Sequence, residues 1–368
     1  KIVLPEGVTH IGVSTFYNSA VKEVNLPSSL KTMGQDAFYT CERLERIAIP
    51  EGIEVIPGSC FFFCTSLSSL TLPSSLKTLD AFSLCGCSSL TTLDLPEGLE
   101  TIGIDALLNV GITELTIPSS CTKFNLSGQK QLKKVTLPAG MTELPMNAFR
   151  RMTSLESVVL PAGITAIPSN LFSGCTSLKS LTIPEGVKTI GEAAFAASGI
   201  ESIVIPESVE KIDNYTFQGC PNLESIDIKA PIKSLPNYFA LECTNLKSVS
   251  LPEGLEEIGF KAFVHCSSLT EVSLPSTVKN MKYAAFAQTG LESVSLPDGI
   301  EHVGEFCFQE IAAERVDLSN TSLTEMYRGL FVKAESLKEV ILPASLKILN
   351  NANFLECASL NTVKCLAQ

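Results

Sequence analysis

The cysteines are the residues of this sequence best suited to do chemistry, because thiolates bind metals and act as nucleophiles. The chain has 13 cysteines among its 368 residues. Cys60 and Cys64, together with Cys85 and Cys87, have a spacing that superficially resembles a zinc site. A zinc tetrahedron requires all four side chains to converge on one point. The interpretation therefore depends on how the chain places these four residues.

Histidine is scarce and occurs only at positions 10, 265 and 302. His265 precedes Cys266, a pairing that suggests a Cys–His nucleophile. Adjacent residues in a turn point in different directions, and no repeated acidic residue is placed to orient the imidazole. We therefore expect His265 to be an exposed residue of the convex side.

Acidic residues are plentiful, but many occupy Pro-Glu-Gly or Pro-Asp-Gly turns, where carboxylates are solvated and do not form an acid–base pair. These turn residues include Glu6, Glu51, Glu97, Glu185, Glu253 and Asp298. Walker, Rossmann and Gly-x-Ser-x-Gly signatures are missing. The sequence thus predicts a protein that is not an enzyme and that uses no cofactor or metal.

Charge and hydrophobicity exclude two classes of partner. The formal net charge of −12 argues against nucleic acid, which needs clustered Lys and Arg, and against anionic membranes. No apolar run approaches the roughly 18 to 20 residues of a membrane span. We therefore expect no nucleic-acid partner and no direct membrane insertion of this segment.

The elements that position these residues come from one repeated unit, anchored on a Leu-Pro or Ile-Pro step. The anchors are Pro5, Pro27, Pro50, Pro73, Pro96, Pro118, Pro138, Pro161, Pro184, Pro206, Pro252, Pro275, Pro297 and Pro343, with Lys229, Ser319 and Leu366 at the same position without proline. Most intervals are 22 or 23 residues; the exceptions are 20 (Pro118 to Pro138) and 24 (Ser319 to Pro343). Such a period indicates a stacked repeat architecture.

Residues 246–269 show the unit clearly. Val249 and Leu251 alternate with serines, as in a half-buried strand, and the following proline ends the strand because it cannot donate to a β-ladder. The remainder predicts a short extended piece and then a helical or 3₁₀ turn that carries Phe263 and Cys266 inward. One unit cannot bury its apolar side alone, so neighbouring units must stack.

The repeat also explains most of the cysteines. Eight of them occupy one position of the unit, namely Cys41, Cys64, Cys87, Cys175, Cys220, Cys243, Cys266 and Cys357. We expect an inward-facing ladder of buried free thiols, with side chains that run parallel and do not face each other. Cys60 and Cys85 then fall at other positions of the unit, which argues against the zinc site.

The predicted fold is a leucine-rich-repeat solenoid, a right-handed β/α superhelix with a parallel β-sheet on the concave face and short helical, 3₁₀ or extended segments on the convex side. We expect residues 1–368 to form a single solenoid of about sixteen repeats of 22–23 residues, with irregular geometry at residues 118–138 and 305–323. The first and last units carry no polar cap, so we expect a segment of a longer or processed protein.

The pattern Leu-x-x-Val-x-Leu-Pro, followed by Ala-Phe-x-x-Cys, resembles the BspA-like leucine-rich repeats of bacterial surface proteins over essentially the whole chain. Residues 178–200 and 246–269 carry the resemblance most clearly, and Leu107, Met152 and Ala240 depart from it. The resemblance implies a secreted or surface-anchored bacterial protein without enzymatic activity. It also implies adhesion to host matrix proteins or to other cells, and it supplies no fixed contact residues.

The surface that the repeat displays most systematically is the strand face, defined by the residues two and four positions before each anchor. In the first units these are Glu23, Asn25, Arg46, Ala48, Ser69 and Thr71. The residues predicted to bind a ligand are Thr92, Asp94, Glu114, Thr116, Lys134, Thr136, Ser157, Ser180, Thr182, Ser202, Ser225, Asp227, Ser248, Ser250, Glu271, Ser273, Ser293, Ser295, Arg315 and Asp317. The alternative is a purely solubilising ladder, since Ser and Thr suit strands.

The preferred hypothesis is a non-catalytic protein-binding or adhesion module of a secreted or surface-anchored bacterial protein, outside the cell or at its surface. Its ligand would be a protein or glycan, such as a host extracellular-matrix or cell-surface molecule, held by a broad, shallow platform and strengthened by multivalency. The alternative is a structural spacer that presents another domain at the cell surface. A large catalytic or binding domain elsewhere in the full-length protein would favour the spacer.

Overall fold

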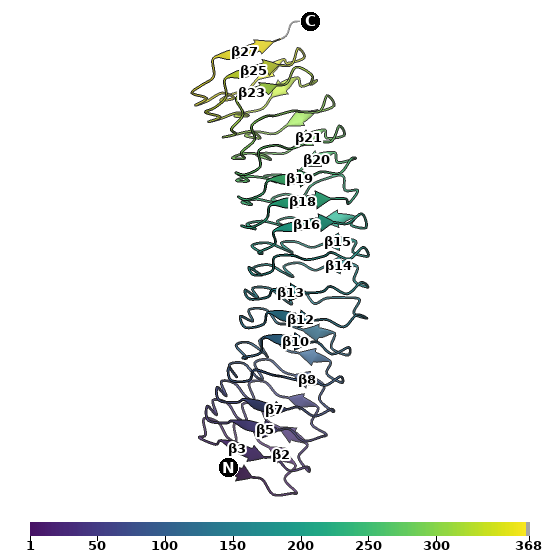
Figure 1. Ribbon diagram of the computed structural model, residues 1–368, viewed down its shortest axis with the longest axis vertical. Helices are drawn as coiled ribbons and strands as arrows, with labels where there is room; N and C mark the ends of the chain where they lie inside the picture. The colour runs from purple at the N-terminus through teal and green to yellow at the C-terminus, as the bar shows by residue number, and fades with distance from the viewer. Residues whose placement is uncertain (366–368) are drawn as a thin grey trace. The chain divides into compact units, whose positions relative to one another are not determined.

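The computed structural model describes residues 1–365 and consists of short strands joined by turns (Figure 1). These residues form 27 strands in parallel sheets of two to four strands. The chain divides into two compact units: unit 1 is Lys1–Ile164 with Leu171–Leu181, and unit 2 is Thr165–Asn170 with Thr182 onward. Leu366, the last predicted anchor, lies outside the described residues. That all repeats belong to one solenoid stays a prediction.

Each repeat forms one coil, and the strands fall into two sets that run along different sides of the coils. The first set precedes the anchors: β1 (Ile2–Val3), β3 (Glu23–Asn25), β5 (Arg46–Ala48), β7 (Ser69–Thr71), β10 (Glu114–Thr116), β12 (Lys134–Thr136), β13 (Ser157–Val158), β16 (Ser202–Ile205), β18 (Ser225–Ile228), β19 (Ser248–Ser250), β23 (Arg315–Asp317), β25 (Glu339–Leu342) and β27 (Thr362–Cys365). The second set follows the anchors: β2 (His10–Ile11), β4 (Thr32–Met33), β6 (Val55–Ile56), β8 (Thr78–Leu79), β9 (Thr101–Ile102), β11 (Lys123–Phe124), β14 (Ala166–Ile167), β15 (Thr189–Ile190), β17 (Lys211–Ile212), β20 (Glu257–Ile258), β21 (Asn280–Met281), β22 (His302–Val303), β24 (Glu325–Met326) and β26 (Ile348–Leu349).

The strand register follows the spacing of the anchors. Ser225 of β18 pairs with Ser248 of β19, one ordinary interval later. Glu114 of β10 pairs with Lys134 of β12 across the 20-residue interval, and Arg315 of β23 pairs with Glu339 of β25 across the 24-residue interval. The chain therefore accommodates a shortened or lengthened repeat outside the strand, and the predicted phase is confirmed.

The convex side contains extended segments and turns, whereas the predicted helical and 3₁₀ turns are not found between residues 1 and 365. In a helix the N–H groups would bond within their own segment. Here Phe38 N–H donates to the carbonyl of Cys60 in the next coil at 2.8 Å, and Thr40 N–H donates to that of Phe62 at 2.7 Å. Left-handed residues recur four apart in these turns, as at Asp36 and Thr40, and this conformation interrupts any helix.

The core is a row of phenylalanines, one from most coils, stacked along the direction of the strands' hydrogen bonds. Phe195 and Phe217 lie 5.4 Å apart between ring centroids with nearly parallel planes, and Phe38 and Phe61 lie 5.3 Å apart. All four side chains are fully buried. Offset stacking of this kind stabilises the pair beyond the area it removes from water.

The cysteine ladder is present, and its thiols make hydrogen bonds that the sequence did not suggest. The Cys64 thiol donates to the carbonyl of Phe38 in the preceding coil at 3.1 Å, and the same carbonyl accepts the N–H of Cys41 at 3.1 Å. Cys243 and Cys357 make the same bond to Phe217 and Phe331. All 13 cysteines are free thiols, and seven of the eight ladder cysteines are buried as predicted, whereas Cys357 is half-buried. Each ladder thiol thus fills the second acceptor site of a buried carbonyl.

The shortened repeat at 118–138 replaces this thiol with an amide. Buried Gln129 occupies the turn, and its Nε2 donates to the carbonyl of Leu107 in the preceding coil. Gly128 N–H donates to the carbonyl of Arg150 at 2.7 Å, so the short turn stays bonded to the next coil. The repeat lacks the Ala-Phe and Cys positions, as predicted, but it keeps the hydrogen bonds that those positions supply.

Three Pro-Glu-Gly turns, at Glu6, Glu51 and Glu97, are joined to serines of the next coil. The Glu51 carboxylate accepts the backbone N–H and the hydroxyl of Ser74, both at 3.0 Å, and Gly52 N–H donates to the hydroxyl of Ser75 at 2.8 Å. The same pairing joins Glu6 to Ser28. Hydrogen bonds from the backbone and hydroxyl of Ser74 lower the pKa of Glu51 below its ordinary value of 4.5. These turn carboxylates therefore cap the neighbouring coil and are not only solvated.

This pKa shift predicts a pH-dependent stability. A carboxylate with a lowered folded pKa adds stability above its ordinary pKa, and the contribution is lost as pH falls through the folded value. We expect Glu51→Gln to lower the urea midpoint at about pH 7 and to have no effect at about pH 2, where both residues are neutral. Glu207→Gln is the matched control, because Ala230 replaces serine in its next coil. Equal midpoint losses at both pH values would contradict the role of the charge.

The close approach of coils also predicts which glycines can be replaced. A Cβ on Gly111 would collide with the carbonyl oxygen of Ser88 in the preceding coil, whereas a Cβ on Gly140 would meet no atom within 4 Å. We expect Gly111→Ala to reduce the free energy of unfolding by about 2 kcal/mol or more and Gly140→Ala to change it by less than about 0.5 kcal/mol. Urea titration followed by circular dichroism measures both, and similar values would show that the coils can move apart.

Candidate binding surface

The strand face is formed as the alternation of the sequence predicts. Its predicted residues are exposed, except that Ser225, Asp227 and Asp317 are half-buried. The residues between them in the strands, such as Leu115 and Val135, are buried. The outward direction of the face is therefore established, whereas a ligand for it stays a prediction.

Within each sheet, pairing places the predicted residues in rows. Glu114, Lys134 and Ser157 are direct neighbours in β10, β12 and β13, and Thr116 lies opposite Thr136. In unit 2 the pairing of β16, β18 and β19 forms one row of serines, Ser202, Ser225 and Ser248. Such rows present hydroxyl groups at the spacing of adjacent strands, about 4.8 Å.

The face is not continuous, and some predicted residues lie outside any strand. These are Thr92, Asp94, Ser180, Thr182, Glu271, Ser273, Ser293 and Ser295. Ser293 and Ser295 flank an isolated bridge between Val294 and Val316. The structure therefore does not bring all predicted residues into one sheet.

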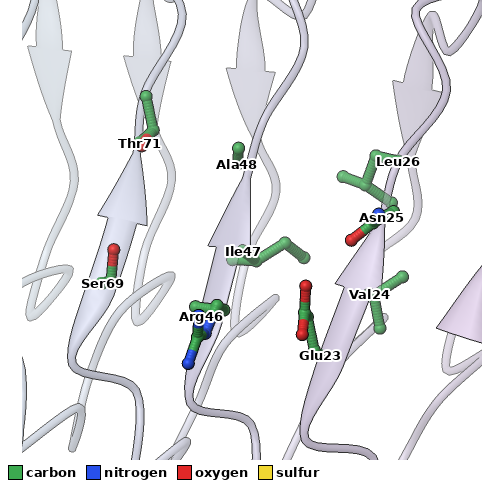
Figure 2. Close-up of a pocket in the computed structure, with 9 residues that line it drawn as sticks. All are labelled: Glu23, Val24, Asn25, Leu26, Arg46, Ile47, Ala48, Ser69 and Thr71. Atoms are coloured by element: carbon green, nitrogen blue, oxygen red, sulfur yellow. The ribbon is translucent and has the colours of Figure 1, made fainter. Parts of the chain in front are cut away.

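One shallow cavity of about 330 Å³ opens on the strand face over β3, β5 and β7. Figure 2 shows Glu23, Arg46 and Ser69 in one row across the strands, with the small side chain of Ala48 in the next row. Lys1 binds the Glu23 carboxylate at 2.9 Å. That hydrogen bond is the main cause of the lowered pKa of Glu23, to which the charge of Arg46 also contributes.

A second cavity, the acidic cavity, has a volume of about 410 Å³ and opens where β10 borders residues 91–97. Four predicted residues line it, Thr92, Asp94, Glu114 and Thr116, above the side chains of leucines. This is the place where the structure combines predicted residues with a recess, which a binding site generally requires.

The far end of the strand face carries a network of ion pairs in place of hydroxyl groups. Arg315 binds Glu339 of the next coil at 2.9 Å and Asp317 of its own strand at 2.9 Å. Lys364 binds the same Glu339 at 2.6 Å, and this hydrogen bond is the main cause of the lowered pKa of Glu339. Exposed pairs of this kind add little stability. They do, however, occupy the guanidinium group of Arg315, which is then less free to bind a ligand.

Eleven of the 13 thiols are buried, and burial raises the pKa of several of them. Burial raises the pKa of Cys60 and Cys64, and it raises the pKa of Cys175 and Cys266 to about 12. His265 is exposed, as expected, in a left-handed turn position. Within residues 1–365 no group of three or more His, Cys, Asp or Glu is arranged to hold a metal ion.

Partly exposed aromatic rows on the turn side were missed by the sequence reasoning. Tyr17 stacks on Tyr39 at 4.8 Å and Tyr39 on Phe62 at 4.7 Å in unit 1, and Tyr215 stacks on Tyr238 at 4.5 Å in unit 2. The signal was present, because aromatic residues recur beside the buried Phe of the unit. Their stacked rings present mainly edges, since each ring face is covered by the next.

This combination of parallel coils, buried Leu and Phe rows and a period of 22 or 23 residues defines a leucine-rich-repeat protein. Residues 9–127, 124–224, 165–289 and 256–367 match the BspA type leucine rich repeat region. The chain belongs to this family, which confirms the resemblance found in its repeat. No curated protein matches the chain.

Solved structures share the fold. A leucine-rich repeat protein from Bacteroides ovatus aligns with a TM-score of 0.71 and 26% identity, over 98% of this chain and 88% of that chain. A leucine-rich repeat protein from Eubacterium ventriosum has a TM-score of 0.48 and 20% identity, over 70% of this chain and 80% of that chain. A leucine rich cell surface protein from Faecalibacterium prausnitzii has a TM-score of 0.37 and 20% identity, over 100% and 88%.

The buried thiols predict a sharp difference in reactivity. With a pKa of about 12, roughly one thiol in ten thousand is ionised at pH 8. We expect iodoacetamide to modify exposed Cys365 in the native protein and all 13 cysteines after unfolding in urea. Mass spectrometry of tryptic peptides identifies the modified sites. Rapid native labelling of Cys175 or Cys266 would contradict the burial of the ladder.

Proposed function

We propose that this protein is a non-catalytic protein-binding and adhesion module of a secreted or surface-anchored bacterial protein. The observation that carries the proposal is the strand face, where rows of Ser and Thr stand on buried aliphatic side chains in successive coils. Membership of the BspA-type repeat family supports it, because proteins with such repeats generally act as interaction or surface proteins. Residues 1–365 contain no helix that is long and apolar enough to cross a membrane.

The chemistry of the face favours many weak contacts over one deep site. Hydroxyl rows offer donors and acceptors to an extended protein or glycan ligand, but the central rows lack the aromatic and arginine side chains that dominate compact hot spots. Such a surface gains strength when several coils, or several copies on one cell, engage a repetitive ligand. Host matrix proteins, mucins and glycans of neighbouring cells are ligands of this kind.

The test is binding to immobilised matrix proteins, mucins and neighbouring bacterial surface proteins. Surface plasmon resonance should detect binding by the wild-type chain and a loss of at least about tenfold in Ser202→Arg/Ser248→Arg, because two arginines interrupt the serine row. Asn222→Arg/Gln131→Arg adds the same charge at exposed turns and should bind like the wild type. Absence of any binding to the whole panel would remove the proposal and leave the spacer function.

A further inference from the structure

The strand face opens at residues 91–95 of unit 1. The sheet that starts at β1 ends at β7, and the next sheet of this side starts at β10. Residues 91–95 lie between them, form no strand, and make no backbone hydrogen bond to any part of the described chain. Their N–H and C=O groups therefore lack the backbone partners that paired strands provide.

The opening is local, because the same coils are bonded together on their other sides. Thr78 and Leu79 of β8 pair with Thr101 and Ile102 of β9. In the turns, Leu84 N–H donates to the carbonyl of Ala106 at 2.9 Å. The coils are thus held in the stack, and only their strand-face segments are released from pairing.

Release of this segment uncovers apolar surface. Leu93 and Leu95 are half-buried, whereas the corresponding residues of β10 and its anchor, Leu115 and Ile117, are 3% and 2% exposed. Leu93 and Leu95 line the acidic cavity together with Leu115. The cavity therefore has an apolar floor beside unpaired backbone groups.

The charges around this floor are all negative. Asp94, Glu97 and Glu114 line the acidic cavity. Within residues 1–365, Asp94 and Glu114 form no ion pair, although Lys134 lies opposite Glu114 in the β10–β12 register. The Glu97 carboxylate accepts hydrogen bonds from the backbone N–H and the hydroxyl of Ser119. By contrast, two other acids of the strand face, Glu23 and Glu339, form ion pairs with lysines.

We propose that the acidic cavity binds an extended peptide segment in which Lys or Arg alternates with an apolar residue. The peptide lies across the strand face, over residues 91–95 and β10. An apolar side chain covers Leu93 and Leu95, and the cationic side chains neighbour Asp94 and Glu114. The net charge of −12 attracts the same kind of partner from a distance. This inference rests on the proposed function, for which it names a site and a partner chemistry.

The experiment uses the full chain and two fluorescent peptides, acetyl-Lys-Val-Lys-Val-Lys-Val-Lys-amide and its Glu-for-Lys counterpart. Fluorescence anisotropy should show binding of the lysine peptide at least about tenfold tighter than the glutamate peptide, with weakening as salt increases. Asp94→Asn/Glu114→Gln should weaken binding of the lysine peptide by at least about tenfold. Glu207→Gln/Glu253→Gln removes the same two charges from exposed turns of unit 2 and should change it less than about twofold.

Amide hydrogen exchange shows where on the protein the peptide binds. Amides of residues 91–95 should exchange rapidly in the free protein and be slowed by the lysine peptide, and urea midpoints verify that both variants remain folded. Equal weakening in the two double variants, unchanged exchange of residues 91–95, or absence of lysine-peptide binding would each overturn the inference. Binding of a matrix protein or a neutral glycan that is lost in Ser202→Arg/Ser248→Arg but kept in Asp94→Asn/Glu114→Gln would overturn it while leaving the proposed function intact.

Discussion

Pairing of backbone groups between successive coils is the constraint on which the other features of this protein depend. Its strands are two to four residues long and its turns bond internally in part, so each coil leaves many N–H and C=O groups to be satisfied by its neighbours. In the turns, alternate N–H groups meet the same requirement: Phe38 and Thr40 donate to the next coil, whereas Tyr39 donates within its own turn. Buried thiols and the amide of Gln129 complete carbonyls that one backbone donor leaves half satisfied. The residue type at these positions is thus determined by the hydrogen-bond acceptor that the neighbouring coil presents.

The period made most of this architecture predictable. The distance between anchors specifies which strand residues pair, so the register at Ser225 and Ser248 follows from counting. Alternation specifies the buried side, because a one-residue slip would expose the leucines. The cysteine ladder followed from the same phase. These predictions succeed because each rests on a pattern of spacing and alternation that recurs in many coils, and not on the details of one contact.

The turns and the interruptions could not be predicted in the same way. Left-handed positions are occupied by Ala193, Tyr215 and Lys261 as well as by glycine, so no residue type marks them. Hydrogen bonds to the next coil impose that conformation despite its local cost. Residues 91–95 also show the same alternation as paired strands such as β19. Whether a segment pairs depends on the positions of both neighbours, which a single repeat does not encode.

The difference between paired and unpaired segments matters for ligand specificity on a repeat surface. A fully paired strand face offers a ligand only side chains, and here those are mostly small hydroxyls that contribute little individually. A segment released from pairing uncovers leucines beside its acidic side chains, and a recess of this kind offers an extended chain both apolar and charged contacts. When a segment does not pair, the fold loses the backbone hydrogen bonds of that segment. Pairing elsewhere in the same coil offsets the loss, as β8 and β9 do for the coil that contains residues 91–95. Under the proposed function, specific recognition would therefore depend less on the most regular coils than on the few positions where regular pairing stops.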